Sequence, residues 1–163
     1  MLNEQAQTMP LARAMAERDP SAFVNSEQRL GEWTIEVAPE KIAEVCRWLK
    51  DEWQFERLST VTAVDWPERD PRFEVVYHLH SIARNERVRL KCRVGGDTPE
   101  IDSVVGVWRG ANWYEREVFD LFGIQFRNHP DLRRIMMPDD WQGHPLRKDY
   151  PVGGEPVRFS EEA

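Results

Sequence analysis

Three acidic side chains and one histidine lie close together in the last third of the chain. Glu115, Glu117 and Asp120 fall within one predicted helix, and His129 follows a few residues after it. Carboxylates and imidazoles are the groups that act as general acids, general bases or metal ligands. In a helix, however, Glu115 and Glu117 are about 200° apart around the axis and cannot converge on one substrate. A freestanding hydrolase built on these four residues is therefore a hypothesis that helix geometry disfavours.

The helix that carries these acids is predicted to run from Trp113 to Phe122. Asn112 can cap its N-terminus while Glu115, three residues later, reaches back to the cap backbone. Gly123 can supply the left-handed residue that ends it. The sequence thus predicts one short helix with a capping signal at each end.

One acid falls on the apolar side of this helix. Glu115 lies among the apolar residues, and an unpaired buried carboxylate costs several kcal/mol. It therefore either serves the capping box in contact with water or is buried beside a cationic or amide partner, and both alternatives stay open. The predicted apolar face comprises Tyr114, Val118, Phe119, Leu121 and Phe122, and the opposite side comprises Trp113, Arg116, Glu117 and Asp120.

The stretch from Gln125 to Pro151 has no sustained period of 2 or 3.6, yet it is rich in large apolar residues. Unstructured loops longer than about 12–15 residues are uncommon in compact domains, and disordered segments are poor in such residues. The stretch should therefore lie against this chain or another protein. Its mixture of large apolar groups with arginine is typical of interface centres, and its four prolines stiffen it. We expect a docking arm that is ordered mainly by its partner.

The same region carries a family resemblance. The spacing of Glu115, Glu117, Asp120, His129, Arg133 and Ile135 resembles the signature of the 30 kDa subunit, or C subunit, of respiratory complex I, the proton-pumping NADH:quinone oxidoreductase. The runs Arg72-Phe-Glu-Val-Val-Tyr-His-Leu, Gly110-Ala-Asn-Trp and Pro145-Leu-Arg-Lys-Asp-Tyr-Pro resemble the same family. The resemblance covers nearly all of the chain from Trp33 onward.

This resemblance implies a cofactor-free structural subunit of the peripheral arm, which supports electron transfer from NADH to quinone. It implies contact with the D subunit, which helps to form the quinone site, and with the B subunit, which carries the last cluster. FMN and iron–sulfur clusters would belong to partner subunits, and the location would be the cytoplasmic side of a bacterial inner membrane. An equivalent subunit of a related membrane-bound hydrogenase or other donor:quinone dehydrogenase would have the same features, because the electron donor binds elsewhere.

We expect no catalytic, cofactor-binding or metal-binding residue in this chain, and an interface with other subunits in its last third. Glu115, Glu117 and Asp120 are expected to pair with arginines such as Arg133, Arg134 or Arg147, within the chain or across that interface. The expected interface residues are Trp113, Glu115, Glu117, Asp120, His129, Leu132, Arg133, Arg134, Trp141, Leu146, Arg147 and Lys148.

Composition sets limits on the alternatives. The 163 residues suit one domain with extensions, and a formal charge of -7 argues against nonspecific binding to nucleic acid. Cys46 and Cys92 are too few and too far apart for a disulfide scaffold or an iron–sulfur ligand set. No apolar run approaches the roughly 18 residues of a membrane span. We expect a soluble protein that meets a membrane only through partners.

The elements upstream predict an α+β domain at residues 32–124, between an N-terminal arm (1–31) and an extended C-terminal interaction segment (125–163). The arm carries a short alanine-rich helix, and a helical turn is expected within residues 99–107. We expect a single four-stranded mixed sheet, formed by a strand, a helix and an antiparallel meander, with helices on one face. The predicted strands are Trp33–Val37, Leu58–Trp66, Phe73–Leu79 and Arg87–Val94, and the helix after Pro39 buries Ile42, Cys46, Leu49 and Trp53.

Two patterns mark the outer face of this sheet. Arg87, Arg89, Lys91 and Arg93 alternate on one side of the last strand, where they repel each other unless acids on neighbouring strands or on a partner pair with them. Glu74 on the adjoining strand is one candidate. The pair His78 and His80 has the spacing of two metal ligands in a strand, but zinc normally takes three or four. We interpret the two histidines as part of a polar face.

Overall fold

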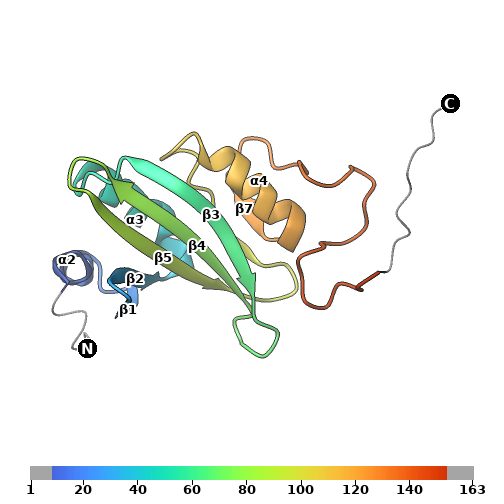
Figure 1. Cartoon of the computed structure of the whole chain (residues 1–163), viewed down its shortest axis with the longest axis horizontal. Coiled ribbons are helices and arrows are strands. Elements are labelled where there is room, and N and C mark those ends of the chain that lie inside the picture. Colours follow the sequence, from blue (N-terminus) through green and yellow to red (C-terminus); the bar gives the residue numbers. More distant parts are fainter. Residues whose placement is uncertain (1–8, 154–163) are drawn as a thin grey trace.

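A computed structural model describes residues 9–153, which form an α+β fold around one mixed sheet (Figure 1). The helices are α2 (Pro10–Arg18), α3 (Ile42–Asp51) and α4 (Ala111–Phe122), with a 3-10 turn, η1 (Pro39–Lys41), before α3. The strands are β1 (Phe23–Arg29), β2 (Glu32–Val37), β3 (Arg57–Asp65), β4 (Phe73–Ser81), β5 (Glu86–Val94), β6 (Glu100–Asp102) and β7 (Gln125–Arg127).

The main sheet has five strands in the order β1-β2-β5-β4-β3. Strands β3, β4 and β5 form the predicted antiparallel meander, and β2 lies parallel to β5. The expectation of four strands is wrong, because β1 pairs with β2 at the edge. Strand β1 was missed because it is mostly polar and exposed, with Ser26 as its one buried residue, so its sequence lacks the alternation of a half-buried strand.

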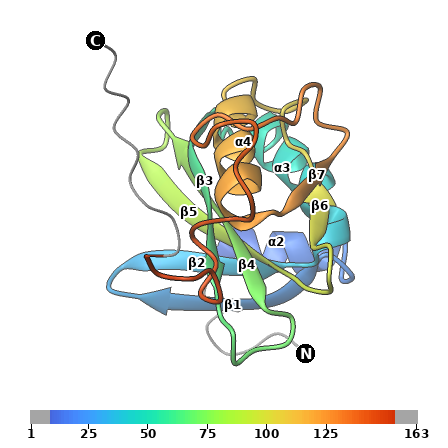
Figure 2. The same ribbon diagram turned by 90° about the vertical axis from the view of Figure 1, so that its right-hand side faces the viewer.

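The core lies between one face of this sheet and the helices. Figure 2 shows α3 and α4 on the same side of the strands. The predicted alternation is confirmed in β5, where Leu90 and Cys92 are buried between partly exposed cations. In β4 the inward residues are buried as expected, but Glu74 and Val76 on the other face are buried as well, so burial alternates only in the second half of the strand. In α3, Ile42, Cys46 and Leu49 are fully buried as expected, and Trp53 lies just after the end of the helix.

Helix α2 lies within the predicted N-terminal arm and packs on the domain. Its Leu11, Ala12 and Met15 belong to the buried core, together with the preceding Met9. Small alanines allow a helix to approach its neighbour closely, so α2 docks with few large apolar groups. None of the helices in residues 9–153 is long and apolar enough to cross a membrane.

A second, two-stranded sheet ties α4 to the core. Strand β6 occupies part of the region predicted as a helical turn, so that prediction is wrong for Glu100–Asp102. It pairs in parallel with β7, and Ile101 lies opposite Phe126. Both side chains are buried. The first residues of the predicted C-terminal segment are therefore a strand of this domain.

Candidate functional site around helix α4

Helix α4 starts two residues earlier than predicted, and its N-terminus has no capping box. The cap position is Gly110, no side chain bonds to the free N–H groups there, and Asn112 lies inside the first turn. The other end follows the prediction, because Gly123 adopts φ 73° and donates its N–H to the carbonyl of Phe119 at 2.8 Å. The capping pattern thus located the end of the helix but not its start.

Glu115 is fully buried, so of the two predicted alternatives the structure has the buried one, with a backbone amide and a hydroxyl as its partners. Its carboxylate accepts hydrogen bonds from the Ser103 hydroxyl at 2.6 Å and from the Val104 backbone N–H at 2.7 Å. Burial raises the pKa of Glu115 to about 7, and these two donors only partly oppose the shift. The carboxyl group therefore holds the loop between β6 and α4 against the helix, and within residues 9–153 it forms no ion pair with an arginine.

His129 lies next to this carboxyl group, with Nε2 3.9 Å from Glu115 Oε2. Its Nδ1 accepts the backbone N–H of Asp131 at 3.0 Å, so the ring proton is on Nε2, which lies 3.3 Å from the carbonyl of Asn112. Burial lowers the pKa of His129, and nearby Arg116 lowers it further. The ring is neutral near pH 7, and its contact with Glu115 is not an ion pair.

Asp120 fastens the following loop, residues 128–150, which we call the C-terminal segment. One carboxylate oxygen accepts the consecutive backbone N–H groups of Ile135, Met136 and Met137 at 3.0, 2.7 and 2.9 Å. The other oxygen accepts Arg134 Nη1 at 2.6 Å, which confirms the predicted pairing of Asp120 with an arginine of this segment. Burial alone would raise the pKa of Asp120, but the four donors outweigh it and the pKa lies below its ordinary value.

Arg116 makes a second connection between α4 and the C-terminal segment. Its guanidinium donates to the backbone carbonyls of Arg133 at 3.1 Å and Arg134 at 3.3 Å, and it lies 5.2 Å from the centre of the Trp113 ring. Of the side predicted to oppose the packed face, Trp113 and Glu117 are exposed as expected, but Arg116 and Asp120 are buried, so the expectation is wrong for these two. Helical periodicity cannot predict that part of this side of α4 is buried, because the segment that packs on it has no periodic pattern of its own.

The C-terminal segment also completes the end of α4, around which it curves (Figure 1). The last carbonyls of the helix have no partner within it. His144 Nδ1 lies 2.9 Å from the carbonyl of Asp120, the Leu146 N–H donates to Leu121 at 3.0 Å, and Arg147 Nε donates to Phe122 at 2.6 Å. The segment is thus the C-terminal cap of the helix.

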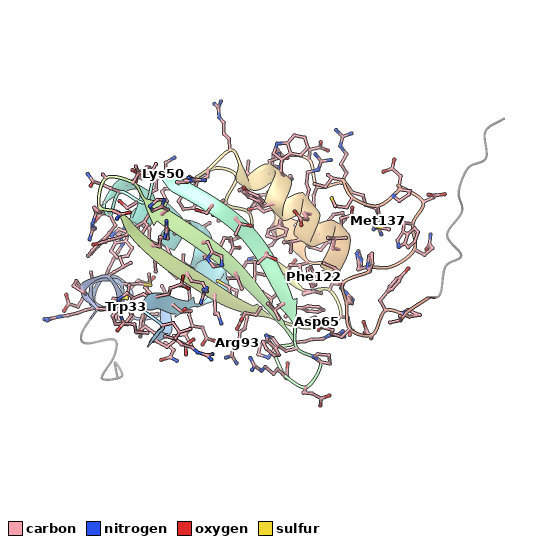
Figure 3. All side chains as sticks on the ribbon, viewed as in Figure 1. Trp33, Lys50, Asp65, Arg93, Phe122 and Met137 are labelled. Carbon is pink, nitrogen blue, oxygen red and sulfur yellow. The ribbon has the colours of Figure 1, made fainter. Side chains whose placement is uncertain are left out.

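A final attachment joins the segment to the sheet. Asp65, labelled in Figure 3 at the end of β3, accepts the backbone N–H of Lys148 at 2.7 Å. Its carboxylate also binds Arg72 through two nitrogens, at 2.6 and 2.7 Å, and Arg72 reaches Asp149 at 2.9 Å. The expected docking arm, ordered mainly by its partner, is therefore not confirmed, because the segment is hydrogen-bonded to α4 and to β3 of its own chain. Asp65, Ser103 and His144 were missed, since nothing in their local sequence indicates these distant partners.

The expected interface residues divide into inner and outer groups. Glu115, Asp120, His129 and Arg134 are taken up by the internal contacts above, and Leu132 and Trp141 are half-buried. Glu117 is exposed and makes no ion pair within residues 9–153, so its predicted pairing with an arginine is not found there. The exposed apolar groups on this side are Trp113 at 63%, Met136 at 61% and Leu146 at 49%. Arg133 and Lys148 are also exposed, whereas Arg147 is partly covered.

This arrangement is poorly suited to acid–base or metal chemistry. Glu115 is directed at the loop that precedes α4 and Asp120 at the segment that follows it, and each carboxylate is already bonded to donors of the chain. Within residues 9–153, no cluster of three metal-ligating side chains is present. The geometry instead fits a helix and loop that present a rigid outer surface.

The chain is similar to known proteins over most of its length. Residues 35–156 match the family described as respiratory-chain NADH dehydrogenase, 30 Kd subunit. The C subunit of the NADH-quinone oxidoreductase of Geobacter sulfurreducens is 50% identical over 141 residues, which cover 86% of this chain and 87% of that protein. The equivalent protein of Geotalea uraniireducens is 51% identical over 140 residues, which cover 86% of this chain and 85% of that protein.

Two solved structures extend the likeness to the fold. The trypsin-resistant fragment of Nqo5 has a TM-score of 0.66 and 31% identity, covering 76% of this chain and 100% of the fragment. A chain of the membrane-bound sulfane sulfur reductase, described as an archaeal respiratory membrane complex, has a TM-score of 0.76 and 26% identity, covering 96% of each chain.

Proposed function

Because the chain belongs to the family of the 30 kDa subunit of the respiratory-chain NADH dehydrogenase, we propose that it is a structural subunit of the peripheral arm of proton-translocating NADH:quinone oxidoreductase, complex I. In this role it binds no cofactor, and FMN and the iron–sulfur clusters belong to neighbouring subunits. It contacts the D and B subunits and lies on the cytoplasmic side of the bacterial inner membrane, attached through its partners.

The observation that carries this proposal is that the buried acids of α4 make internal contacts, whereas large apolar side chains beside them are exposed. The buried acids Glu115 and Asp120 hold two loops in place, which leaves no free carboxylate pair for chemistry. Trp113, Met136 and Leu146 remain largely exposed beside arginine side chains. Large apolar anchors with arginine are the groups that dominate binding energy at protein interfaces. The segment is folded on its own chain and offers this outer surface to a partner.

A second candidate comes from the likeness to the sulfane sulfur reductase chain. In that case the chain would be the corresponding subunit of a related membrane-bound complex that uses another electron donor. The two candidates share the same role for this chain and differ only in its partners. They are separated by the donor that the purified complex oxidises.

The proposal is tested by replacing exposed anchors in a strain whose only copy of the subunit is the variant. Trp113→Ala together with Met136→Ala should leave the isolated chain folded and lower the yield of the assembled complex. Val24→Ala is a suitable control, because Val24 is also exposed, at 55%, but lies on β1. Normal assembly with the double variant would contradict the proposed docking surface.

A further inference from the structure

The cations of β5 lie on the sheet face that is opposite the core, and three of them have acidic partners within the chain. Arg89 pairs with Glu32 at 2.6 Å, Lys91 with Glu74 at 3.1 Å and Arg93 with Glu36 at 2.9 Å. The pairing of Lys91 with Glu74 confirms the partner expected from the sequence. Most of this strand is therefore neutralised by β2 and β4.

The fourth cation, Arg87, has no acidic residue opposite it. In the register of the sheet it lies directly opposite His80, which itself lies opposite Arg57. Residues directly opposite one another point to the same face of the sheet, so neither arginine has an acid as its cross-strand neighbour on β4. We call Arg57, His80 and Arg87 the basic row. Within residues 9–153 neither arginine of this row makes an ion pair, and His80 Nε2 is buried without a hydrogen-bond partner.

Acids do lie close to the basic row, but each is bound to another group. The Glu56 carboxylate accepts the backbone N–H groups of Ile82 and Ala83 at 3.1 and 3.3 Å. Glu86 pairs with an arginine of the β4–β5 turn at 2.7 Å, and Glu32 is held by β5 as described above. This end of the sheet face thus carries an excess of positive charge in a chain whose net charge is -7.

A groove of about 330 Å³ runs across β2, β5, β4 and β3, and Arg87 is the member of the basic row that lines it. Its walls also include the hydrogen-bonding groups of Ser59, Thr60 and His78, and one acid, Glu32 of β2, which is paired with Arg89. Hydroxyl and guanidinium groups together are suited to bind carboxylates, and arginine can do so through two parallel hydrogen bonds. Because its lining spans four strands, the groove suits an extended peptide better than a single ion.

We propose that the basic row and this groove bind an acidic polypeptide segment of a neighbouring subunit. The inference rests on the proposed function, because it needs an assembly of several subunits, and it adds a second interface on the sheet face away from α4. Charge complementarity identifies the occupant, since acidic side chains would pair with Arg57 and Arg87, which make no ion pair within residues 9–153. Nucleic acid or an anionic membrane would need a much broader basic surface than one row on an acidic protein.

Site-specific crosslinking identifies the occupant. A photoreactive p-benzoylphenylalanine is placed at Thr60 in the groove, and at Arg69 beyond the other end of β3 as a control, in the tagged full-length chain. The complex is purified, irradiated and analysed by mass spectrometry. We expect the Thr60 probe to crosslink to an acidic peptide of another subunit. A crosslink to a peptide without acids, or no crosslink in a complex that contains the chain, would overturn the inference. If no other subunit accompanies the chain, the proposed function fails first and this inference falls with it.

Charge removal supplies an independent measurement. Arg57→Gln and Arg87→Gln should each lower retention of the chain in the complex by about threefold at physiological salt, the effect of a partly exposed ion pair. The melting temperature of the isolated variants should stay the same, because neither arginine makes an ion pair within residues 9–153. Arg69→Gln removes the same charge elsewhere and should leave retention unchanged. It is a control for retention alone, because Arg69 also lies 4.0 Å from the centre of the Trp66 ring and that contact is lost. If Arg57→Gln and Arg87→Gln instead destabilise the isolated chain, the arginines serve its own fold and the inference is wrong.

Discussion

Replacing Asp120 by asparagine should release the C-terminal segment from α4. The carboxylate binds three consecutive backbone N–H groups and Arg134, at distances of 2.6–3.0 Å. Asparagine keeps one carbonyl oxygen but puts an NH₂ group where the second acceptor was. Asp120→Asn therefore removes the negative charge and leaves at least one of these donors facing another donor.

The magnitude follows from the burial of the partners. Breaking a buried ion pair typically costs about 3–5 kcal/mol. Asp120 is fully buried, but the Arg134 side chain is 15% exposed and Met136 is exposed, so released donors can reach water. We therefore expect the lower end of that range, about 3 kcal/mol, as a local opening of residues 128–150.

Hydrogen exchange at the amides of Ile135, Met136 and Met137 measures this opening directly. A cost of about 3 kcal/mol corresponds to a loss of protection of about a hundredfold. Glu117→Gln is the matched control, because Glu117 lies on the same helix, is exposed and has no ion pair within residues 9–153; it should change stability by less than about 0.5 kcal/mol. Unchanged amide protection in Asp120→Asn would refute the assignment of Asp120 as the fastening point.

The same carboxyl group predicts a pH dependence. Since the pKa of Asp120 is lowered from 3.8 in the folded chain, its contribution to stability is complete above about pH 5 and is lost as the pH falls through the folded-state pKa. Protection of the three amides should follow this acid limb in the parent chain. In Asp120→Asn the limb should be absent, and its persistence would assign it to another group.

Three further predictions concern Glu115, Gly123 and the cofactor content of the chain. Burial raises the pKa of Glu115 from 4.5 to about 7, so between these pH values the folded chain holds a proton that the unfolded chain releases, and the free energy of unfolding should fall as the pH rises. Urea unfolding across this pH range should show the fall in the parent chain and not in Glu115→Gln. An equal fall in both would contradict the prediction. Gly123→Ala should lower the free energy of unfolding by about 1–3 kcal/mol, because the φ of Gly123 is 73° and an added Cβ would lie 2.5–2.6 Å from His144 and Arg147. Denaturant unfolding measures this loss, and a stability equal to that of the parent chain would show that this end of α4 is looser than described. The purified chain alone should be colourless and free of metal, and stoichiometric flavin, iron or zinc in absorption and metal analysis would overturn the proposed absence of cofactors.

Alternation of apolar residues was sufficient to predict most of the sheet. The inward residues of β4 and β5 follow the period of 2, and the core face of α3 follows the helical period. Edge strand β1 was not predictable in this way, because neither of its faces is buried along its length. Alternation of apolar residues reflects burial of one face of a strand, so a strand that is hydrogen-bonded but exposed on both faces lacks this pattern.

The candidate site was predicted in its residue types but not in its contacts. Asp120 was expected to pair with an arginine, and Arg134 is that partner. For Glu115 the sequence left a capping box and burial beside a cationic or amide partner both open, and its partners are Ser103 and the backbone N–H of Val104, in a loop more than ten residues away. Such contacts depend on the path of aperiodic chain, which backbone periodicity and capping rules do not determine.

The central claim is that this chain is a structural subunit of a quinone-reducing complex, and the most direct measurement is the composition and activity of what it purifies with. The tagged full-length chain should be isolated from detergent-solubilised membranes of a strain in which it is the only copy of the subunit. We predict D and B subunits in amounts equal to this chain, together with NADH:quinone reductase activity in the same fraction. Recovery of the chain alone, or with partners that lack both a quinone-reducing activity and an iron–sulfur subunit, would contradict the claim.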